Sequence, residues 1–501
     1  MKRFTILFIM AQFAWLTTLT ATESGLTRNT RTDTLAIGLQ EAILQALERN
    51  PAVSIQRLDP EIAKTYTGEA GAAFDPQLAI TTSNSETKQQ RFLGSRPDPF
   101  ELTTKRSQYD VGISETLPTG TTVLANASIS GTLSSIYSDQ YTGSVGLTVT
   151  QSLLQGFGTG YNMASLRKAR LDVDISILEL KAVAEQVTAD VERAYWDLFL
   201  AEQEMAIQQK SLDLAGQQLD ESRERVAVGR LPELELAAVL AEVASRREAL
   251  IDAQSRYEQA RLYFLFLLNP AQANPWELCL VPVDQPFIPL DTLDSVPVHE
   301  QLARKYRADL QQAQLNLQKN KLDLVRTRNG LLPRLDLFIN LGRTTYAKSF
   351  KESIPDVQSP FYDATAGISF ELPLRNREAR AQYSRTQFTH DQMELSLLNM
   401  ERLVQRDVRS AHIEVLRARQ QIEATQVARD LQEKKFLAEQ EKFRVGKSTN
   451  FLVLQTQRDF VAGQLGEARA KVAYLNALVD LYLMEGTLLE RRGIRSFSAR
   501  P

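Results

Sequence analysis

The chain has 501 residues, a hydrophobic content of 43% and a formal net charge of −3. Its length exceeds the range of one compact core and favours an extended or repeated architecture. The balanced charge gives no sign of a nucleic-acid-binding protein or of a solvating tail. Cys279 is the only cysteine, which excludes an intrachain disulfide, and we expect a packed thiol without a chemical role.

The N-terminus has the pattern of a secretory signal. Two basic residues, Lys2 and Arg3, precede an apolar run over residues 4–19, and Ala21 is a suitable processing site. We therefore predict a signal peptide over residues 1–21, the alternative being a buried N-terminal helix. No cysteine adjoins it, so a lipid anchor of the bacterial lipoprotein kind is not expected. No later apolar run approaches the ~20 residues of a membrane helix, so the exported chain is either soluble or enters a membrane as strands.

The next part of the chain changes from helix to strand. A short helical stretch is predicted over about residues 34–70. Past Pro76, β-branched or alternating runs bounded by Gly, Ser and Asn are typical of strands. Four strands are expected, at residues 77–82, 109–116, 121–129 and 144–151. The tight turn 117–120 (Leu-Pro-Thr-Gly) joins the second strand to the third, and a polar loop is expected at 83–107.

A long helical hairpin follows. Residues 162–228 contain no proline and one glycine, and their apolar residues recur at alternating spacings of four and three, as in a coiled coil. The small-residue seam holds Val187, Ala194, Ala201, Gln208 and Ala215, and the large-residue seam holds Val191, Leu198, Met205, Leu212 and Leu219. At ~1.5 Å per residue this helix reaches on the order of 100 Å. Gly229 and Pro232 interrupt it, and an apolar seam over 236–268 predicts an antiparallel return.

After a Pro-rich linker the same order recurs. The second copy is predicted to hold a short helix, two strands with a polar loop between them, and a helical hairpin that turns at Gly446. These segments, in chain order, are the linker 270–295, the helix 296–329, the β segment 334–371 with its loop at 342–360, the end of the hairpin near 489, and a tail 490–501.

The two copies align at two different offsets. Val228-Gly229-Arg230 recurs as Val445-Gly446-Lys447, 217 residues later (446 − 229), whereas Pro76 recurs as Pro333 and Asn50 falls on Arg307, 257 residues later (333 − 76). Repeat 1 (34–269) therefore has about 40 residues more than repeat 2 (296–489) between these points. We assign the surplus to one additional strand hairpin at roughly 105–145, inside the β segment 77–151.

The strands fit either of two settings. Strands of about 9–11 residues suit a membrane barrel, and aromatic residues lie in or beside them as an interfacial girdle would. These aromatic residues are Tyr109, Tyr137, Tyr141, Phe338, Tyr346, Phe361, Tyr362 and Phe370. The soluble alternative is a small β domain that caps a helical stalk. Six strands cannot enclose a water-filled barrel in one chain, so the membrane interpretation requires several protomers.

The duplicated order of these motifs resembles the TolC-like outer-membrane channel family of Gram-negative efflux pumps and type I secretion systems. Residues 39–51 are similar to the family's opening helix, 74–78 and 332–337 to its helix-to-strand transitions, 150–158 and 370–374 to its strand-to-helix exits, and the two Val-Gly turns to its hairpin tips. The resemblance covers nearly all of the mature chain.

The resemblance implies an α+β membrane protein. Long coiled-coil hairpins would form a periplasmic α-barrel, and a homotrimer would complete one transmembrane β-barrel in contact with outer-membrane lipid. The function would be passive conduction of substrates exported by an inner-membrane transporter, of RND or ABC type, through a periplasmic adaptor (membrane fusion protein). Usual members have four strands per protomer and twelve per trimer. If the additional hairpin joins the barrel wall, this chain would have six strands per protomer and eighteen per trimer. The alternative is a hairpin that extends above the membrane.

The resemblance also implies two kinds of site, both at the hairpin tips. The adaptor-docking residues would be Val228, Gly229, Arg230, Leu231, Val445, Gly446, Lys447 and Ser448. Well-known members have an acidic constriction just inside the tips. Here Glu235 occupies one such place, but Leu452 and Gln455 stand where aspartates would be expected, so we predict a weaker constriction of Glu235 with Gln455. The alternatives are a merely structural turn and a solvated glutamate.

The sequence contains no pattern typical of catalysis. The three histidines, His299, His390 and His412, are scattered, and no metal-ligand spacing, nucleotide loop or nucleophile elbow is present. We expect no enzyme activity, no cofactor, no metal and no nucleic-acid partner. The alternative to a channel is a secreted coiled-coil structural or adhesive protein with a small β head.

Overall fold

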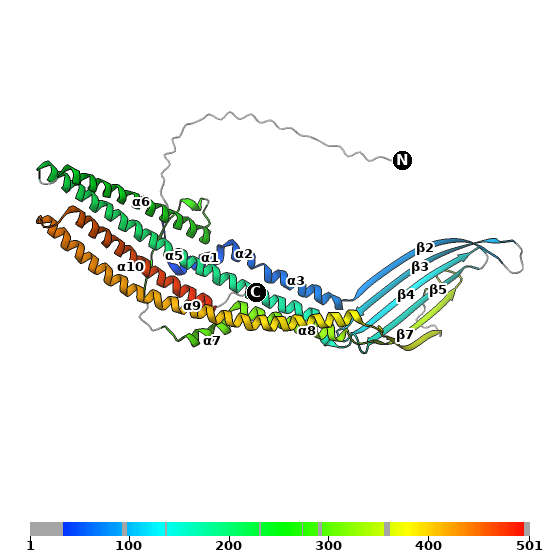
Figure 1. The fold of residues 1–501 in the computed structure, drawn as a ribbon. Helices are drawn as coiled ribbons and strands as arrows, with labels where there is room; N and C mark the ends of the chain where they lie inside the picture. The colour runs from blue at the N-terminus through cyan, green and yellow to red at the C-terminus, as the bar shows by residue number, and fades with distance from the viewer. Residues whose placement is uncertain are drawn as a thin grey trace, which may run out of the picture.

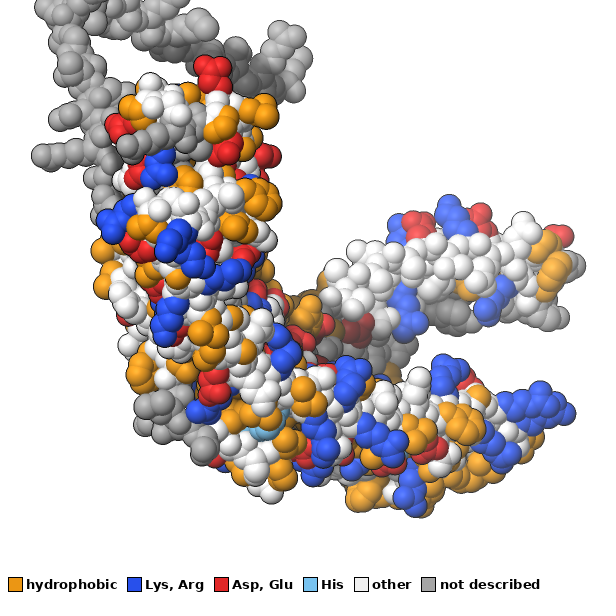
Figure 2. All heavy atoms as spheres, turned by 60° about the vertical axis from the view of Figure 1, so that its left-hand side comes forward, with side chains coloured by type: hydrophobic (Ala, Val, Ile, Leu, Met, Phe, Trp, Pro, Cys, Tyr) orange, Lys and Arg blue, Asp and Glu red, His pale blue; other side chains and the backbone are white. Residues whose placement is uncertain are grey.

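The computed structural model describes residues 34–92, 98–135, 138–229, 232–272, 274–288, 293–354 and 361–494. The predicted signal segment 1–21 and residues 495–501 of the predicted tail lie outside these ranges. The described chain is a long helical stalk with a six-stranded sheet at one end (Figure 1). From a second direction its surface bends around an open hollow, with acidic and basic side chains intermingled over the helices (Figure 2). The predicted α+β class is confirmed.

Two helical hairpins form the half of the stalk remote from the sheet (Figure 1). α5 (Ala164–Ala227) pairs with α6 (Glu233–Leu268), and α9 (Arg377–Arg444) pairs with α10 (Asn450–Glu485). Because α5 also lies against α10, the order across the stalk is α6, α5, α10, α9. The two hairpins therefore lie side by side, with α6 and α9 at the outer edges.

The predicted seams of α5 are its packing surfaces. All five residues of the small-residue seam are buried, and Val191 and Leu198 of the other seam are fully buried. Small side chains in one seam let the neighbouring helices approach closely. Midway along the helix, the ring of Tyr195 meets Trp196 and Phe264 edge to face, with centroids 5.2 and 5.8 Å away. This packed interface, rather than helix propensity, stabilises a helix of 64 residues.

The two predicted short helices are each broken into segments. The first consists of α1 (Leu39–Arg49), α2 (Pro51–Gln56) and α3 (Asp59–Gly71), and the second of α7 (Val296–Tyr306) and α8 (Ala308–Asn329). Next to the sheet, α3 packs on α5, and α8 packs on both α5 and α9. The stalk therefore presents four helices to the sheet, in the order α3, α5, α8, α9.

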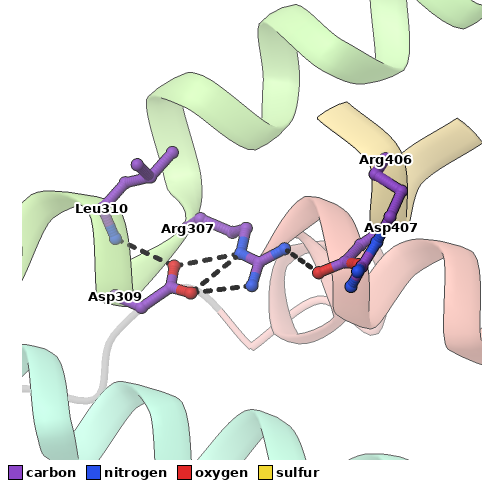
Figure 3. Close-up of polar contacts among 5 residues, drawn as sticks. All are labelled: Arg307, Asp309, Leu310, Arg406 and Asp407. Carbon is purple, nitrogen blue, oxygen red and sulfur yellow. Dashed lines mark hydrogen bonds and ion pairs between the residues drawn. The ribbon is translucent and has the colours of Figure 1, made fainter. Parts of the chain in front are cut away.

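Equivalent junctions of the two repeats are held by different side chains. Between α1 and α2, Asn50 accepts a backbone N–H at the start of α2 and donates to the carbonyl of Leu267, 3.0 Å away. Between α7 and α8, Arg307 ion-pairs with Asp309 at 2.7 Å and with Asp407 of α9 at 3.6 Å (Figure 3). A helix break leaves backbone polar groups without partners inside the helix, so polar side chains are expected at both junctions. Each of the two side chains also binds a residue of a long hairpin and so holds its junction against the stalk.

The segment predicted as a linker contains regular structure. Its strand β6 (Cys279–Pro282) pairs in parallel with β1 (Thr34–Ile37). Just after β6, Asp284 accepts a hydrogen bond from the Tyr195 hydroxyl at 3.0 Å, which joins the segment to the core of α5. The Pro-rich composition predicted only a connection, because pairing between such distant segments leaves no local pattern. Cys279 is half-buried in this strand.

Glu185 of α5 provides a test of the stalk's packing. It is 4% exposed, and its nearest cation is Lys181 at 3.7 Å. Burial raises the pKa of Glu185 from 4.5 to about 7, against the lowering effect of Lys181. Because the folded pKa is the higher one, ionisation destabilises the fold as the pH rises towards 7, whereas below pH 4.5 both states hold the proton.

We therefore expect Glu185→Gln to raise the free energy of unfolding by about 3 kcal/mol near pH 8 and to leave it unchanged near pH 4. Chemical denaturation at both pH values measures this. An equal gain at both pH values would contradict the titration of Glu185 and would indicate a packing effect.

The sheet joins both repeats edge to edge. Its strands, in spatial order, are β2 (Gln77–Arg91), β3 (Phe100–Thr116), β4 (Thr121–Ser134), β5 (Gln140–Ser152), β7 (Arg334–Ala347) and β8 (Tyr362–Glu371). All neighbours are antiparallel, and β5 pairs with β7 of the other repeat. Repeat 1 contributes four strands and repeat 2 contributes two.

The strands extend further than predicted, so the predicted loops of the sheet were longer than those in the structure. β2 and β3 pair as far as Arg91 and Phe100, so the loop expected at 83–107 is mostly strand, and the hairpin placed at 105–145 consists of β3 and β4. These strand ends are polar on both faces, which hides the alternation that predicts a strand. The predicted tight turn at 117–120 is confirmed, with Gly120 at φ 86°. Among the described helices, none is long and apolar enough to cross a membrane.

Candidate functional site

The register of the strands sorts the sheet into two faces. Residues directly opposite on neighbouring strands share a face, and successive residues of one strand alternate between faces. Ile113 of β3, for example, is opposite Leu78 of β2 and Ala125 of β4. Ala125 is in turn opposite Leu147, and Leu147 is opposite Leu341. One continuous face can be followed in this way through all six strands.

This face carries an apolar band. It consists of Leu78, Ile80, Tyr109, Val111, Ile113, Val123, Ala125, Ala127, Ile129, Val145, Leu147, Val149, Leu335, Leu337, Ile339, Leu341, Ala364, Ala366, Ile368 and Phe370. On β3 its residues are exposed, whereas the alternate residues are half-buried, so the band lies on the more open side of the sheet. An aligned, exposed apolar band is the feature of a lipid-facing barrel wall.

The opposite face is polar. It carries Thr81, Ser83, Ser85, Gln108, Asp110, Ser114, Asn126, Ser128, Ser144, Thr148, Thr150, Asn340, Thr344, Thr365 and Ser369. The hydroxyls of Ser128 and Ser144 are 2.7 Å apart. Leu102, Leu124 and Phe338 are exceptions, and the ring of Phe338 covers Gly367, where a Cβ atom would come within 2.6 Å of the ring. A face covered by so many hydroxyl and amide groups is suited to contact with water.

Charged and aromatic side chains mark the end of the band that is remote from the stalk. On the apolar face, Lys105 pairs with Glu86 at 3.7 Å, and Lys88 pairs with Glu101 at 3.6 Å. Beside them, Phe350 packs edge to face on Tyr109 and Tyr141, with centroids 5.8 and 6.5 Å away. A transition from apolar through aromatic to charged residues is what a membrane–water interface selects.

The predicted tips are two matching turns at the far end of the stalk. Gly229 (φ 74°) and Gly446 (φ 77°) follow the long helices α5 and α9, and their N–H groups donate to Val226 and Phe443. No atom lies within 4 Å of a Cβ built at either glycine, so backbone conformation, not space, requires glycine there. Of the predicted docking residues, Arg230 and Leu231 lie outside the described residues.

The other predicted tip residues are placed at the molecular surface. Val228 and Val445 are 68% and 64% exposed, and Lys447, two residues after Val445, is exposed as well. Ser448 is half-buried and donates to Glu439. The Ser448 hydroxyl and the Lys442 ammonium hold the pKa of the Glu439 carboxyl below its ordinary value.

Glu235 and Gln455 lie on the same groove between α6 and α10. Both are exposed, and the groove has a volume of about 690 Å³. Its other lining residues are Ala238, Ala241, Thr449, Asn450, Phe451, Leu454 and Arg458. The structure therefore brings together the two residues that the sequence paired, within one protomer.

A buried ion-pair cluster near this groove was not predicted. Glu242 of α6, 3% exposed, binds Arg246 of its own helix and Arg458 of α10, whose Nε lies 3.0 Å away. Burial raises the pKa of Glu242, but the two guanidinium groups outweigh it and hold that pKa below the ordinary value. Further from the tip, Glu204 is bound by Arg469 in the same way. Only the i, i+4 spacing of Glu242 and Arg246 could have been noticed in the sequence.

The histidines contact other side chains and do not form a common site. His299 is buried and bound to Glu485, and its ring centroid is 5.5 Å from that of His412. His390 lies at the α8–α9 contact, 3.2 Å from Asn320. Among the described residues no group of three or more His, Cys, Asp or Glu could hold a metal ion.

A sheet with one lipid-compatible and one polar face, continuous with a stalk of long helical hairpins, defines a membrane channel protein with a helical extension. The chain belongs to the outer membrane efflux protein family, whose sequence model matches residues 42–269 and 300–487. The predicted family is therefore confirmed, and with it the outer membrane as the location. The interpretation as a secreted adhesive protein is wrong.

Known proteins are similar to this chain in sequence and in fold. The pyoverdine export outer membrane protein OpmQ of Pseudomonas putida is 26% identical over 332 residues, which cover 63% of this chain and 66% of OpmQ. The outer membrane channel CmeC of Campylobacter jejuni superposes with a TM-score of 0.65 at 16% identity, over 90% of this chain and 86% of CmeC. The outer membrane protein VceC of Vibrio cholerae superposes with a TM-score of 0.65 at 15% identity, over 89% of this chain and 96% of VceC. These structures show that the fold is shared.

Proposed function

We propose that this protein is a passive channel that conducts exported substrates across the outer membrane. The observation that carries the proposal is the two-faced sheet: its apolar band suits lipid, and its polar face suits a water-filled lumen. No chemical step is required of the channel, because an inner-membrane transporter would supply the energy. The export function in the name of OpmQ supports this proposal.

The free edges of the protomer support a closed trimer. β2 and β8 are exposed along nearly their whole length, which is the expected state of edge strands without neighbours. β2 leads away from the stalk and β8 leads back to it, so β8 of one copy could pair antiparallel with β2 of the next. Head-to-tail contacts of this kind form a closed ring when the rotation between copies closes, as it would in a trimer.

The edge helices carry apolar side chains that a neighbouring protomer would cover. On α9 these are Phe388, Leu395, Ile413, Val427 and Leu431, and on the opposite edge they are Ile55, Ile62, Tyr66, Leu240, Ile251 and Phe266. Each is exposed by half or nearly half of its surface. Because an exposed apolar stripe of this length marks an interaction surface, stalk and sheet favour the same ring of protomers.

We further propose that the tips receive a periplasmic adaptor, which connects the channel to its transporter. The exposed Val228 at one tip, and the exposed Val445 with the basic Lys447 at the other, offer the mixed apolar and charged surface of a docking site. A matching turn in each repeat would give six docking positions of one kind around a trimer.

Glu235 and Gln455 are proposed to form a weak constriction inside the tips. We expect Glu235→Gln to lower the cation selectivity of the reconstituted channel by about twofold, because exposed carboxylates act through water and salt. Glu233→Gln is the matched control, since Glu233 is exposed in the same helical turn but does not line the groove. Equal selectivity of both variants in planar bilayers would rule out the constriction.

Purification from outer membranes tests the main proposal. We expect a heat-modifiable trimer that forms stable aqueous pores in planar bilayers, and crosslinks from a photoreactive residue at Val445 to the cognate adaptor. A species that is released without detergent, or a trimer without conductance, would contradict a channel. Absence of the adaptor crosslink alone would contradict only the docking site.

A further inference from the structure

We infer that the β3–β4 hairpin is a full part of the barrel wall, so that the trimer is closed by eighteen strands and its membrane bore is as wide as its helical tunnel. This inference rests on the proposed trimeric channel. It separates this chain from an arrangement in which the surplus hairpin projects above the membrane and β2 pairs with β5.

The ladders on both sides of the hairpin are complete. β3 pairs with β2 from Ser114 and Gln77 to Phe100 and Arg91, without interruption. On the other side, β4 pairs with β5 along its length, as shown by the Ser128 and Ser144 hydroxyls 2.7 Å apart. A hairpin that projected above the membrane would leave β2 and β5 as neighbours, whereas here two strands lie between them.

The inserted strands obey the two-faced pattern of the rest of the sheet. On β3, Val111 and Ile113 lie in the apolar band, and Gln108 and Asp110 lie on the polar face. On β4 the band continues through Ala125, Ala127 and Ile129, while Asn126 and Ser128 between them are polar. Lipid on one side and water on the other would impose this alternation, and a hairpin surrounded by water would not need it.

The turn of the hairpin is docked at the junction of sheet and stalk. Gly120 accepts from the N–H of Ser152 at 3.1 Å, and Gly158 donates to Thr119 at 3.0 Å, so the turn binds the segment between β5 and α5. A Cβ at Gly120 would come within 2.3 Å of the carbonyl oxygen of Gly156. The inserted hairpin therefore spans the whole height of the sheet, from its loops to the stalk.

The dimensions of sheet and stalk agree with this wall. Four helices per protomer meet the sheet, and twelve helices spaced 8–10 Å apart form a ring of about 110 Å circumference. Eighteen strands about 4.8 Å apart and tilted by about 40° also form a ring of about 110 Å, whereas twelve at that tilt give about 75 Å. The wider sheet continues the tunnel without a step, and the tips become the part of the channel that limits the size of the substrate.

Disulfide pairing in a Cys279→Ser background distinguishes the two walls. Ser83→Cys with Gln108→Cys tests the β2–β3 contact, and Ser128→Cys with Ser144→Cys tests β4–β5. In the alternative wall, β2 and β5 would be neighbours, as β7 and β8 are in repeat 2. Asn340 is opposite Thr365 in that pair, and the repeat offsets of 257 and 217 residues relate these two residues to Ser83 and Thr148. Ser83 would therefore lie opposite Thr148. In the six-stranded sheet two strands and a six-residue offset along β5 separate these residues by more than about 14 Å, which is beyond disulfide range.

After oxidation of intact outer membranes, we expect near-complete disulfides in the first two pairs and none in Ser83→Cys with Thr148→Cys, as mass spectrometry of the peptides would show. A disulfide in the third pair, or the absence of both others, overturns the inference. Cryo-electron microscopy of the trimer gives the second readout. We expect a barrel of eighteen strands, and a barrel of twelve strands would contradict the inference. A twelve-stranded conducting trimer would leave the proposed function intact, and a non-trimeric or non-conducting species would refute the function itself.

Discussion

Replacement of Leu147 by arginine is expected to abolish insertion of the protein into the outer membrane. Leu147 lies inside the apolar band, opposite Ala125 and Leu341 on its two neighbouring strands. A lipid-facing arginine near the bilayer midplane costs about 2–4 kcal/mol, and a trimer would carry three of them. We expect heat-modifiable trimers in the outer-membrane fraction to fall at least tenfold, as seen by immunoblotting.

Thr148→Arg is the matched control for this substitution. Thr148 is the next residue of the same strand and lies on the polar face. Its arginine would enter the lumen, so trimers should assemble normally and the pore should shift towards anion selectivity. If Thr148→Arg blocked assembly while Leu147→Arg did not, the two faces of the sheet would be reversed and the proposed wall would be wrong.

Replacement of Arg458 by alanine is expected to loosen the tips of the two hairpins. Its loss leaves the buried Glu242 with Arg246 as its only remaining partner in the cluster. Breaking a buried ion pair costs about 3–5 kcal/mol, but Arg458 is largely exposed, so about 1–2 kcal/mol per protomer is expected. Because this contact joins α6 to α10, its loss should make separation of the two hairpins near their tips about tenfold easier in each protomer, and we expect a higher single-channel conductance at neutral pH.

The same contact predicts a pH dependence and a control. Because the two arginines hold the folded pKa of Glu242 below its ordinary 4.5, the contact is fully formed above that value and is lost as the pH falls through the lower folded pKa. Acidification should therefore raise the conductance of the wild-type channel and change that of Arg458→Ala little. Arg444→Ala is the control, since Arg444 is exposed near the same tip and pairs with Glu441 of its own helix. Identical conductance of the two variants would exclude Glu242 and Arg458 as a tip contact.

The long helices and the repeat could be predicted because their signals are local. A seven-residue spacing specifies which side of α5 is buried, and Gly229 and Gly446 mark the turns, since both have positive φ. The number of strands followed from comparing the two copies. Their length did not, because beyond the band both faces of β2 and β3 contact water and the alternation disappears.

Contacts between distant segments were decided by the tertiary structure alone. β6 pairs with β1 across most of repeat 1, and Glu242 meets Arg458 from the other hairpin, although neither pairing follows from spacing along the chain. The position of β3 and β4 between β2 and β5 was left open for the same reason. The spacing of apolar residues along the sequence indicates which side of each helix or strand is shielded from water. The partner that covers that side depends on how the elements assemble, so register, wall and tip contacts appear only in the folded chain.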